Sequence, residues 1–317
     1  MAAVDFNLCI GHAEPPQPVA WNRRDLILYA LGIGAGPDDL AYVYEGTRGF
    51  RAVGTYPLVL GLKGDGNDTN VFADMVGGRS ATPGFPKLDP NTIVHGEQSI
   101  QVLAPIPPVA EPGWKLRKRI VGVRDAPEKG KGLVLETEVR LVSPTGHTHA
   151  IMIGSAFYRG GSQGTGFSKL IVEKPAAVKP PARKPDFELE EKTSPAQAAL
   201  YRLSGDYNPL HIDESIGKRG GLPGAILHGL CSYGHAARAV LRSVNPQDGK
   251  ADAPVTSLLS IAARFTSPVM PGDTLVTQVW TDKQADGTVK VAFEQSVKGG
   301  KKSLGGGSAL HGMGGAR

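Results

Sequence analysis

Cysteine is scarce in this sequence, and long apolar runs are absent. The two cysteines, Cys9 and Cys231, lie far apart and lack metal-ligand spacing, so we expect no disulfide framework and a reducing intracellular compartment. No apolar run approaches the ~18 residues that a membrane span needs. The first residues lack the basic start and apolar core of a signal peptide. The pattern Gly-x-Ser-x-Gly is also missing, which argues against an α/β-hydrolase nucleophile.

The charge of the chain is weak and dispersed. A net charge of +5 is too small to indicate nucleic-acid binding. It is equally consistent with ordinary surface charge and with a phosphate-bearing small ligand. With 40% hydrophobic and 21% charged residues, the composition is typical of a globular protein. A length of 317 residues favours two domains over one.

A proline-rich segment divides the chain. Residues 173–185 contain four prolines, four lysines or arginines and almost no core-forming side chains. This composition predicts an extended linker between two folded units. We therefore expect an N-terminal unit at residues 1–172 and a C-terminal unit at residues 186–317.

The two units resemble diverged copies of each other. Residues 29–37 align with residues 201–209 without a gap, and a tyrosine, a leucine and a proline coincide. Each unit later contains a Pro-Gly pair, at 112–113 and at 271–272, followed by an apolar run. Two short matches in the same order favour an internal duplication.

Helices and antiparallel strands are both expected. A capping-box start at Ser194 predicts a helix that ends at Gly205. Apolar residues at helical spacing predict a longer helix over about residues 227–244. Alternation with a period of two predicts strands at residues 133–141, 274–280 and 289–293. The side chains expected to face inward in the last two strands are Leu275, Val279, Val289, Val291 and Phe293. Each unit is therefore expected to be an α+β fold, a helix with a mostly antiparallel sheet.

One loop of the second unit concentrates groups that can carry chemistry. Between Gly205 and His211 it places a carboxylate (Asp206), an amide (Asn208) and the His211 imidazole within six residues. A carboxylate and an imidazole can hold one water between them, one group taking a proton while the other donates one. The alternative is an ordinary Asx-type turn, which prefers the same residue types. The loop alone does not separate these two interpretations.

Gly229 lies at the start of the expected long helix. Backbone N–H groups at a helix N-terminus are unpaired and carry partial positive charge. A glycine there lets a ligand oxygen approach its N–H closely, which is the geometry of an oxyanion site. The alternative is a simple helix start in which the glycine serves packing.

Together these motifs resemble the signature of the hydratase 2/MaoC-like family of (3R)-specific enoyl-CoA hydratases. The specific part is the core from Asp206 to His211, followed by His228 and Gly229. The first half is similar to the hydratase segment of peroxisomal multifunctional enzymes of type 2, at residues 29–35, 44–46, 94–98 and 128–132. The similarity covers most of residues 20–300.

This resemblance implies a double hot-dog fold, in which each of two tandem units is a long helix wrapped by an antiparallel sheet. It implies that Asp206 and His211 form an acid/base pair, that Asn208 assists, and that the Gly229 N–H polarises a thioester carbonyl. The positions that match substrate or CoA contacts are His95, Gly96, Lys129, Tyr207, Pro209, Leu210 and Phe265. No metal is implied, and no cofactor other than the CoA of the substrate.

The resemblance also assigns different tasks to the two copies. The C-terminal copy would keep the chemistry, and the N-terminal copy would make room for the acyl chain. The internal alignment agrees, because the first-half positions that match the carboxylate, amide and imidazole are Gly34, Gly36 and Asp39.

Two of the expected contacts and one expected strand each have an alternative interpretation. Lys129 is equally consistent with a solvated loop lysine, and Phe265 with an ordinary core aromatic. Residues 305–307 are all glycine where a strand is expected, which predicts a bulge or a close backbone contact.

The function expected from the resemblance is reversible addition of water to trans-2-enoyl-CoA in fatty-acid β-oxidation. The physiological direction is open. A thioesterase and a non-catalytic acyl-CoA-binding protein are the alternatives. The resemblance points to a peroxisome, whereas an ending of Gly-Gly-Ala-Arg is not a Ser-Lys-Leu address, so the cytoplasm is the other expectation. A homodimer is an additional hypothesis.

Overall fold

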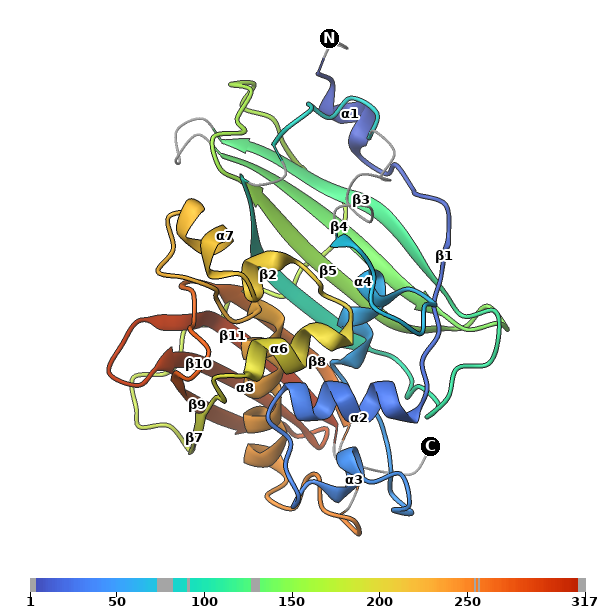
Figure 1. Ribbon diagram of the computed structural model, residues 1–317, viewed down its shortest axis with the longest axis vertical. Coiled ribbons are helices and arrows are strands. Elements are labelled where there is room, and N and C mark those ends of the chain that lie inside the picture. The colour runs from blue at the N-terminus through green and yellow to red at the C-terminus, as the bar shows by residue number, and fades with distance from the viewer. Residues whose placement is uncertain are drawn as a thin grey trace.

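The computed structural model describes residues 4–72, 82–89, 92–126, 132–253, 255 and 257–312. Both halves contribute to one antiparallel sheet (Figure 1). Its strands are β1 (Gln17–Pro18), β2 (Ile93–Val102), β3 (Lys115–Ala126), β4 (Gly132–Val142), β5 (Thr148–Tyr158), β6 (Ser168–Leu170), β7 (Phe187–Lys192), β8 (Ser257–Phe265), β9 (Thr274–Lys283), β10 (Thr288–Val297) and β11 (Lys302–Gly312). The α-helices are α1 (Phe6–Cys9), α2 (Arg23–Gly32), α3 (Leu40–Val43), α4 (Leu60–Lys63), α6 (Gln197–Tyr201), α7 (Glu214–Arg219) and α8 (Gly229–Val244). The 3-10 helices are η1 (Tyr56–Val59), η3 (Arg202–Ser204) and η4 (Pro209–His211).

The strand order repeats from one half to the other. Along the sheet it is β1-β3-β4-β5-β2-β8-β11-β10-β9-β7, and β6 pairs with β3. From the centre outward, each half contributes its first long strand, then the fourth, the third and the second. The strands β2 and β8 pair antiparallel at the centre, with Glu97 opposite Arg264. The expected duplication is therefore confirmed in the topology, and the two units share one continuous sheet.

The aligned segments of the two halves also meet in space. The rings of Tyr29 on α2 and Tyr201 on α6 lie 6.1 Å apart between centroids. A Cβ on Gly32 would lie 3.3 Å from the Cα of Tyr201, so a larger side chain would push the two helices apart. The helix expected over residues 194–205 exists as α6 and η3 but begins only at Gln197, three residues after Ser194. It ends at Gly205 as expected, where a φ of 128° favours glycine.

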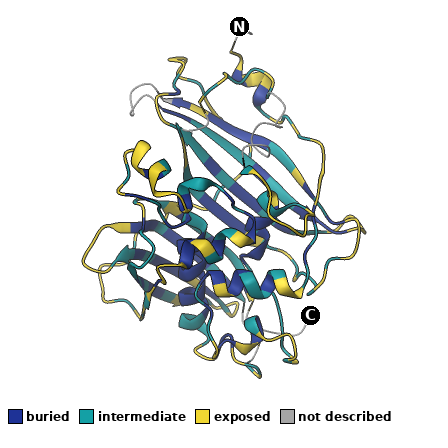
Figure 2. Ribbon diagram, in the orientation of Figure 1, coloured by how far each residue is buried: buried dark blue, intermediate teal, exposed yellow. Residues whose placement is uncertain are grey.

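The central helix α8 is buried on nearly all sides. It begins two residues after the expected start, and 11 of its 16 residues are buried. Figure 2 draws this helix mostly in the colour of buried residues. Strands β7 to β11 pack against it. On another side it meets the end of α2, where a Cβ on Gly234 would lie only 2.3 Å from Ile33. This helix joins the cores of the two halves.

The described part of the first half has only shorter helices. The longest is α2, with ten residues, and η1 and α4 follow each other over residues 56–63. The strands agree closely with the sequence, since β9 and β10 include both expected ranges. The side chains expected to face inward are all buried, namely Leu275, Val279, Val289, Val291 and Phe293. None of the described helices is long and apolar enough to cross a membrane.

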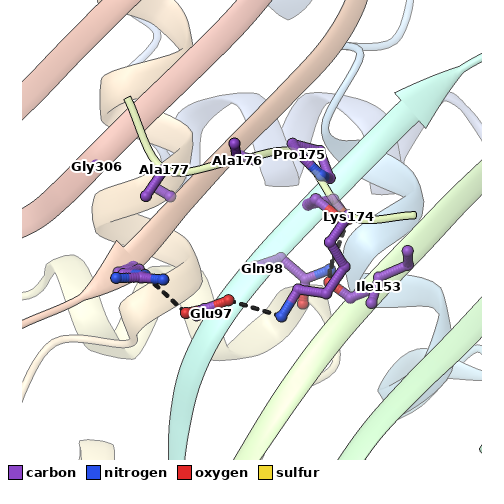
Figure 3. Close-up of a pocket in the computed structure, with 12 residues that line it drawn as sticks. Glu97, Gln98, Ile153, Lys174, Pro175, Ala176, Ala177 and Gly306 are labelled. Carbon is purple, nitrogen blue, oxygen red and sulfur yellow. Dashed lines mark hydrogen bonds and ion pairs between the residues drawn. The ribbon is translucent and has the colours of Figure 1, made fainter. Parts of the chain in front are cut away.

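The proline-rich segment is held against the sheet along part of its length. It crosses the sheet where β2 meets β8 (Figure 3). The ammonium of Lys174 lies 2.7 Å from a carboxylate oxygen of Glu97 and 2.6 Å from one of Glu136. Further along, the Val178 N–H donates to the carbonyl of Gly306 at 3.2 Å. Ion pairs and backbone bonds therefore hold this segment against the sheet.

The three consecutive glycines at residues 305–307 form a β-bulge and also a close backbone contact. The pairing of β11 with β8 shifts register between Gly305 and Ser308, and Gly306 has a φ of 62°. A Cβ on Gly307 would lie 2.4 Å from the carbonyl oxygen of Phe293. Both sequence-based expectations for these glycines are confirmed.

Candidate active site

The loop from Gly205 to His211 is a tight structure held by its own side chains. The Asn208 side-chain oxygen accepts the Leu210 N–H at 3.0 Å and caps η4. The Asn208 N–H donates to Oδ1 of Asp206 at 3.2 Å. The Asx-type bonds of the structural alternative are therefore present. They engage the Asn208 oxygen and one Asp206 oxygen, and the remaining polar atoms of both side chains can meet a ligand.

His211 is buried, and one of its nitrogens is fixed. Its Nδ1 lies 2.9 Å from the carbonyl oxygen of Ile226. A carbonyl only accepts, so Nδ1 carries the hydrogen and Nε2 keeps its lone pair. Burial lowers the pKa of His211, while the charge of Asp206 acts in the opposite direction. At neutral pH the imidazole therefore presents a lone pair that can accept a proton.

A second histidine lies against the first. The rings of His228 and His211 are stacked, with centroids 3.7 Å apart and planes inclined by 26°. His228 was quoted in the sequence motif only as the neighbour of Gly229 and was not named as a site residue. Its position before the start of α8 was the signal that could have identified it.

Asp206, His211 and His228 bring one ligand-type atom each to within 4.8 Å of one another. Such a group could in principle hold a metal ion. However, the stacked rings hold their in-plane lone pairs in nearly parallel planes, whereas metal ligands must converge on one point. One nitrogen of each ring is engaged by a backbone carbonyl, a bond that metal-ligating histidines also make, so it does not separate the two roles. The arrangement suits hydrogen bonding to a small molecule better than metal ligation.

The start of α8 lies next to the central strands. A Cβ on Gly229 would be 3.1 Å from the ring of Phe265 at the end of β8. The same ring lies 4.6 Å from the ring of His95 on β2, between centroids. The charge of Asp206 acts on the pKa of His95, which burial lowers overall. Gly229, Phe265, His95 and Asp206 therefore form one neighbourhood, and the first half contributes to it through the β2–β8 pairing.

The first-half part of this site has its own support. Nε2 of His95 lies 3.0 Å from the side-chain oxygen of Gln98, a residue not named as a site residue. Gly96 lies at a register shift between β2 and β5, and Gly154 opposite Gln98 leaves room for this pair. The bulge at Gly96 thus belongs to the strand segment that carries His95.

The remaining expected contacts of the CoA ester lie in the loop itself or outside the described residues. Tyr207 is buried, with the guanidinium of Arg202 over its ring at 5.1 Å. Pro209 begins η4, and the carbonyl of Leu210 accepts the Ile226 N–H at 3.4 Å. These three residues shape the loop. Lys129 lies outside the described residues.

The first-half copy of the loop is filled by α8. A Cβ on Gly34 would lie 2.4 Å from Cε1 of His235. Asp39 is 3% exposed, pairs with Arg238 at 2.9 Å, and accepts the Gly36 N–H at 3.0 Å. Ion pairs thus occupy the place that a second carboxylate–imidazole pair would need. This agrees with the expectation that one copy alone can work chemically.

The fold and the site define a double hot-dog protein whose C-terminal copy carries a hydratase-type loop. The chain belongs to the hydratase 2/MaoC-like family. The MaoC like domain matches residues 176–301, and the MFE-2 hydratase 2 N-terminal domain matches residues 20–160.

Two curated relatives and one solved structure illustrate this membership. The chain is 34% identical to "Enoyl-CoA hydratase 2, peroxisomal" from Arabidopsis thaliana, over 95% of the chain and 94% of the relative. It is 36% identical to "Peroxisomal multifunctional enzyme type 2" from Mus musculus, over 89% of the chain but only 36% of that longer relative. A crystal structure of a MaoC-like dehydratase from Phytophthora capsici is 35% identical, with a TM-score of 0.83, and covers 98% of this chain and 100% of that one.

Proposed function

We propose that this protein is a (3R)-specific 2-enoyl-CoA hydratase, a hydro-lyase that reversibly adds water to trans-2-enoyl-CoA in fatty-acid β-oxidation. The observation that carries the proposal is the approach of Asp206 and His211 to within 4.8 Å, in the neighbourhood of the α8 N-terminus. The family and the names of the curated relatives support the same activity.

The mechanism starts from the thioester carbonyl. The Gly229 N–H, unpaired at the first turn of α8, would donate to the carbonyl oxygen. This donation stabilises the enolate charge that develops as water attacks C3, and such a donor typically contributes about 10²–10³-fold in rate. The apolar ring of Phe265 lies beside Gly229, and a low local dielectric would strengthen the same hydrogen bond.

The attacking water would lie between Asp206 and His211. Nε2 of His211 accepts one proton of the water as its oxygen bonds to C3, and Asp206 holds the other hydrogen and stabilises the imidazolium. The proton held by the pair then passes to C2, and the enolate electrons form the new C–H bond. Water is thus added across the double bond with no other reactant, and the reverse sequence is dehydration.

The remaining predicted contacts complete the substrate site in this proposal. His95 and Phe265 would border the thioester end, and Asn208 would donate from its amide nitrogen. Gly96 and Lys129, with the loop residues Tyr207, Pro209 and Leu210, are proposed contacts of the CoA ester. The CoA of the substrate is the cofactor-like group, and we propose no metal.

Peroxisomal location and homodimerisation are separate proposals. The word peroxisomal in the names of two relatives supports the first. Fractionation of cells that express the tagged chain tests the location, and light scattering of the purified chain tests the dimer.

The activity is tested by supplying purified protein with trans-2-enoyl-CoA esters of several chain lengths. We expect the ultraviolet absorbance of the conjugated thioester to fall and chiral analysis to find (3R)-3-hydroxyacyl-CoA. Release of free CoA would instead identify a thioesterase. Binding of the ester without turnover would identify a non-catalytic acyl-CoA-binding protein.

Gly229 provides a specific test of the oxyanion assignment. In Gly229→Ala the added methyl would lie 3.1 Å from the Phe265 ring, so the ring or the helix start must shift by a few tenths of an ångström. We expect kcat to fall about tenfold, less than on removal of a donor, because the N–H remains but is displaced. Steady-state kinetics measures this.

A matched control for this variant is Gly224→Ala. Gly224 lies in the segment that leads into α8, and the methyl group added there would be 3.7 Å from the nearest atom. The variant should leave kcat within about twofold, as expected for an ordinary van der Waals contact. Equal losses in the two variants would remove Gly229 from the proposed mechanism.

A further inference from the structure

His228 lies beside three parts of the proposed catalytic machinery in the second half, namely His211, the backbone of Asp206 and Gly229. Its ring is stacked on His211 at 3.7 Å. Its Nε2 lies 3.1 Å from the backbone carbonyl oxygen of Asp206. Its own backbone forms the N-cap of α8, so the next residue is Gly229. One side chain thus joins the imidazole, the carboxylate segment and the helix start.

These contacts fix the chemical form of His228. The Asp206 carbonyl can only accept, so Nε2 carries the hydrogen and Nδ1 has a bare lone pair. Nδ1 is buried and has no hydrogen-bond partner within the described chain. Burial, and then the neighbouring His211, lower the pKa of His228 to about 2. His228 is therefore neutral throughout the physiological range, and it adds no positive charge beside His211.

The surroundings of His228 explain why it holds its place. The side chain is 1% exposed, and the ring of Tyr201 lies 4.9 Å away at an inclination of 52°. The charged groups near the stacked His211 and His228 rings are Asp206 and, on η3, Arg202. The His95 ring on β2 also lies near Asp206. The imidazole of His228 therefore stays between Tyr201 and His211.

We propose that His228 is a positioning residue that holds His211, Asp206 and the Gly229 N–H in one reactive arrangement without touching the substrate. The inference rests on the proposed hydratase function. The ring stack sets the plane of His211, and the bond to the Asp206 carbonyl sets how far the carboxylate segment lies from α8. A displacement of about 1 Å in such a geometry can cost about 10²-fold in rate.

Two variants separate the two contacts. His228→Gln keeps an N–H donor near the position of Nε2 and removes the ring, whereas His228→Phe keeps a ring and removes the donor. In each we expect kcat with trans-2-enoyl-CoA to fall about 10²-fold while KM changes by less than about threefold, because substrate contacts remain. A residue that only stabilises the fold would alter the amount of folded enzyme and leave kcat per folded molecule unchanged.

His311→Gln is the matched control for loss of a buried imidazole. His311 is 0% exposed, and neither ring nitrogen has a partner within the described chain. It lies on β11 opposite Leu258, seven positions along β8 from Phe265. This variant should change the unfolding midpoint and leave kcat per folded molecule within about twofold.

A double substitution tests whether His228 acts through His211. In a His211→Ala background, His228→Gln should lower the residual kcat by less than about twofold, since the group it positions is gone. An equal loss in both backgrounds, or an unchanged kcat in the single variants, overturns the positioning role alone. A wild-type protein that hydrates no enoyl-CoA overturns the proposed function and this inference with it.

Discussion

Asp206→Asn and His211→Ala are each expected to lower kcat for enoyl-CoA hydration by about 10³-fold, the middle of the range for a lost general acid or base. The asparagine keeps the size of Asp206 and the bond from the Asn208 N–H, but it loses the charge that stabilises the imidazolium. The alanine removes the His211 imidazole, whose Nε2 is the proposed acceptor of the proton from water. Both losses should be seen in kcat, measured on folded protein.

The pH profile of the Asp206→Asn variant gives a second readout. Burial lowers the pKa of His211, and the Asp206 carboxylate raises it. Without that carboxylate the pKa should fall further, so the acid limb of the residual activity should move to lower pH. An acid limb that stays in place would contradict the assignment of His211 as the group that must be neutral.

Asp213→Asn is the matched control for the loss of a carboxylate nearby. Asp213 is exposed and caps α7 by accepting the Ser215 N–H at 2.8 Å, a bond that asparagine can retain. Its kcat should stay within about twofold of wild type. If this variant lost as much activity as Asp206→Asn, general disturbance of the loop would explain both.

Asp39→Asn is expected to reduce the free energy of unfolding by about 3 kcal/mol, as for other buried pairs from which one partner is removed. Asp39 bonds Arg238 at 2.9 Å and Arg242 at 2.7 Å, and its side chain is 4% exposed. The substitution leaves Arg238 buried with Glu191 as its remaining carboxylate partner in the described chain. Urea unfolding at neutral pH measures the change.

The pH dependence of stability has a defined sign. Burial alone would raise the pKa of Asp39, but Arg238, the Gly36 N–H and Arg242 hold it below its ordinary value. A lowered folded-state pKa stabilises the protein above the unfolded value of ~3.9, and this contribution is lost as the pH falls through the folded pKa. The stability of Asp39→Asn should therefore decline less steeply than that of wild type below about pH 4.

Asp38→Asn supplies the control. Asp38 is the exposed neighbour of Asp39, so its loss should change stability by less than about 0.5 kcal/mol. Should Asp39→Asn prove equally mild, the ion pairs of α8 would contribute little to the union of the two halves.

Local signals in the sequence predicted much of the site. Gly205 and Pro209 define a loop by their backbone preferences alone, and Gly229 marks a helix start. Strand alternation predicted which residues of β9 and β10 face inward. The internal alignment identified Gly34 and Asp39 as the altered copy of the catalytic loop.

The rest depends on contacts between distant residues, which no local period encodes. His228 meets the Asp206 carbonyl only because α8 starts beside the loop, and His95 approaches the same site only because β2 pairs with β8. Arg238 and Asp39 are 199 positions apart. The contacts of Lys174 are of the same kind. The composition of its segment predicts a linker, and only the structure shows the ion pairs that bind Lys174 to the sheet.

The divergence of the two copies is hard to reverse. Returning a carboxylate to position 34 would place its first carbon 2.4 Å from the His235 ring and 3.0 Å from a nitrogen of Arg238. The helix residues that fill this space, His235 and Arg238, also pair with Glu191, and Arg238 pairs with Asp39. A second reaction centre in the first half would therefore require coordinated substitutions on α8 as well as at position 34.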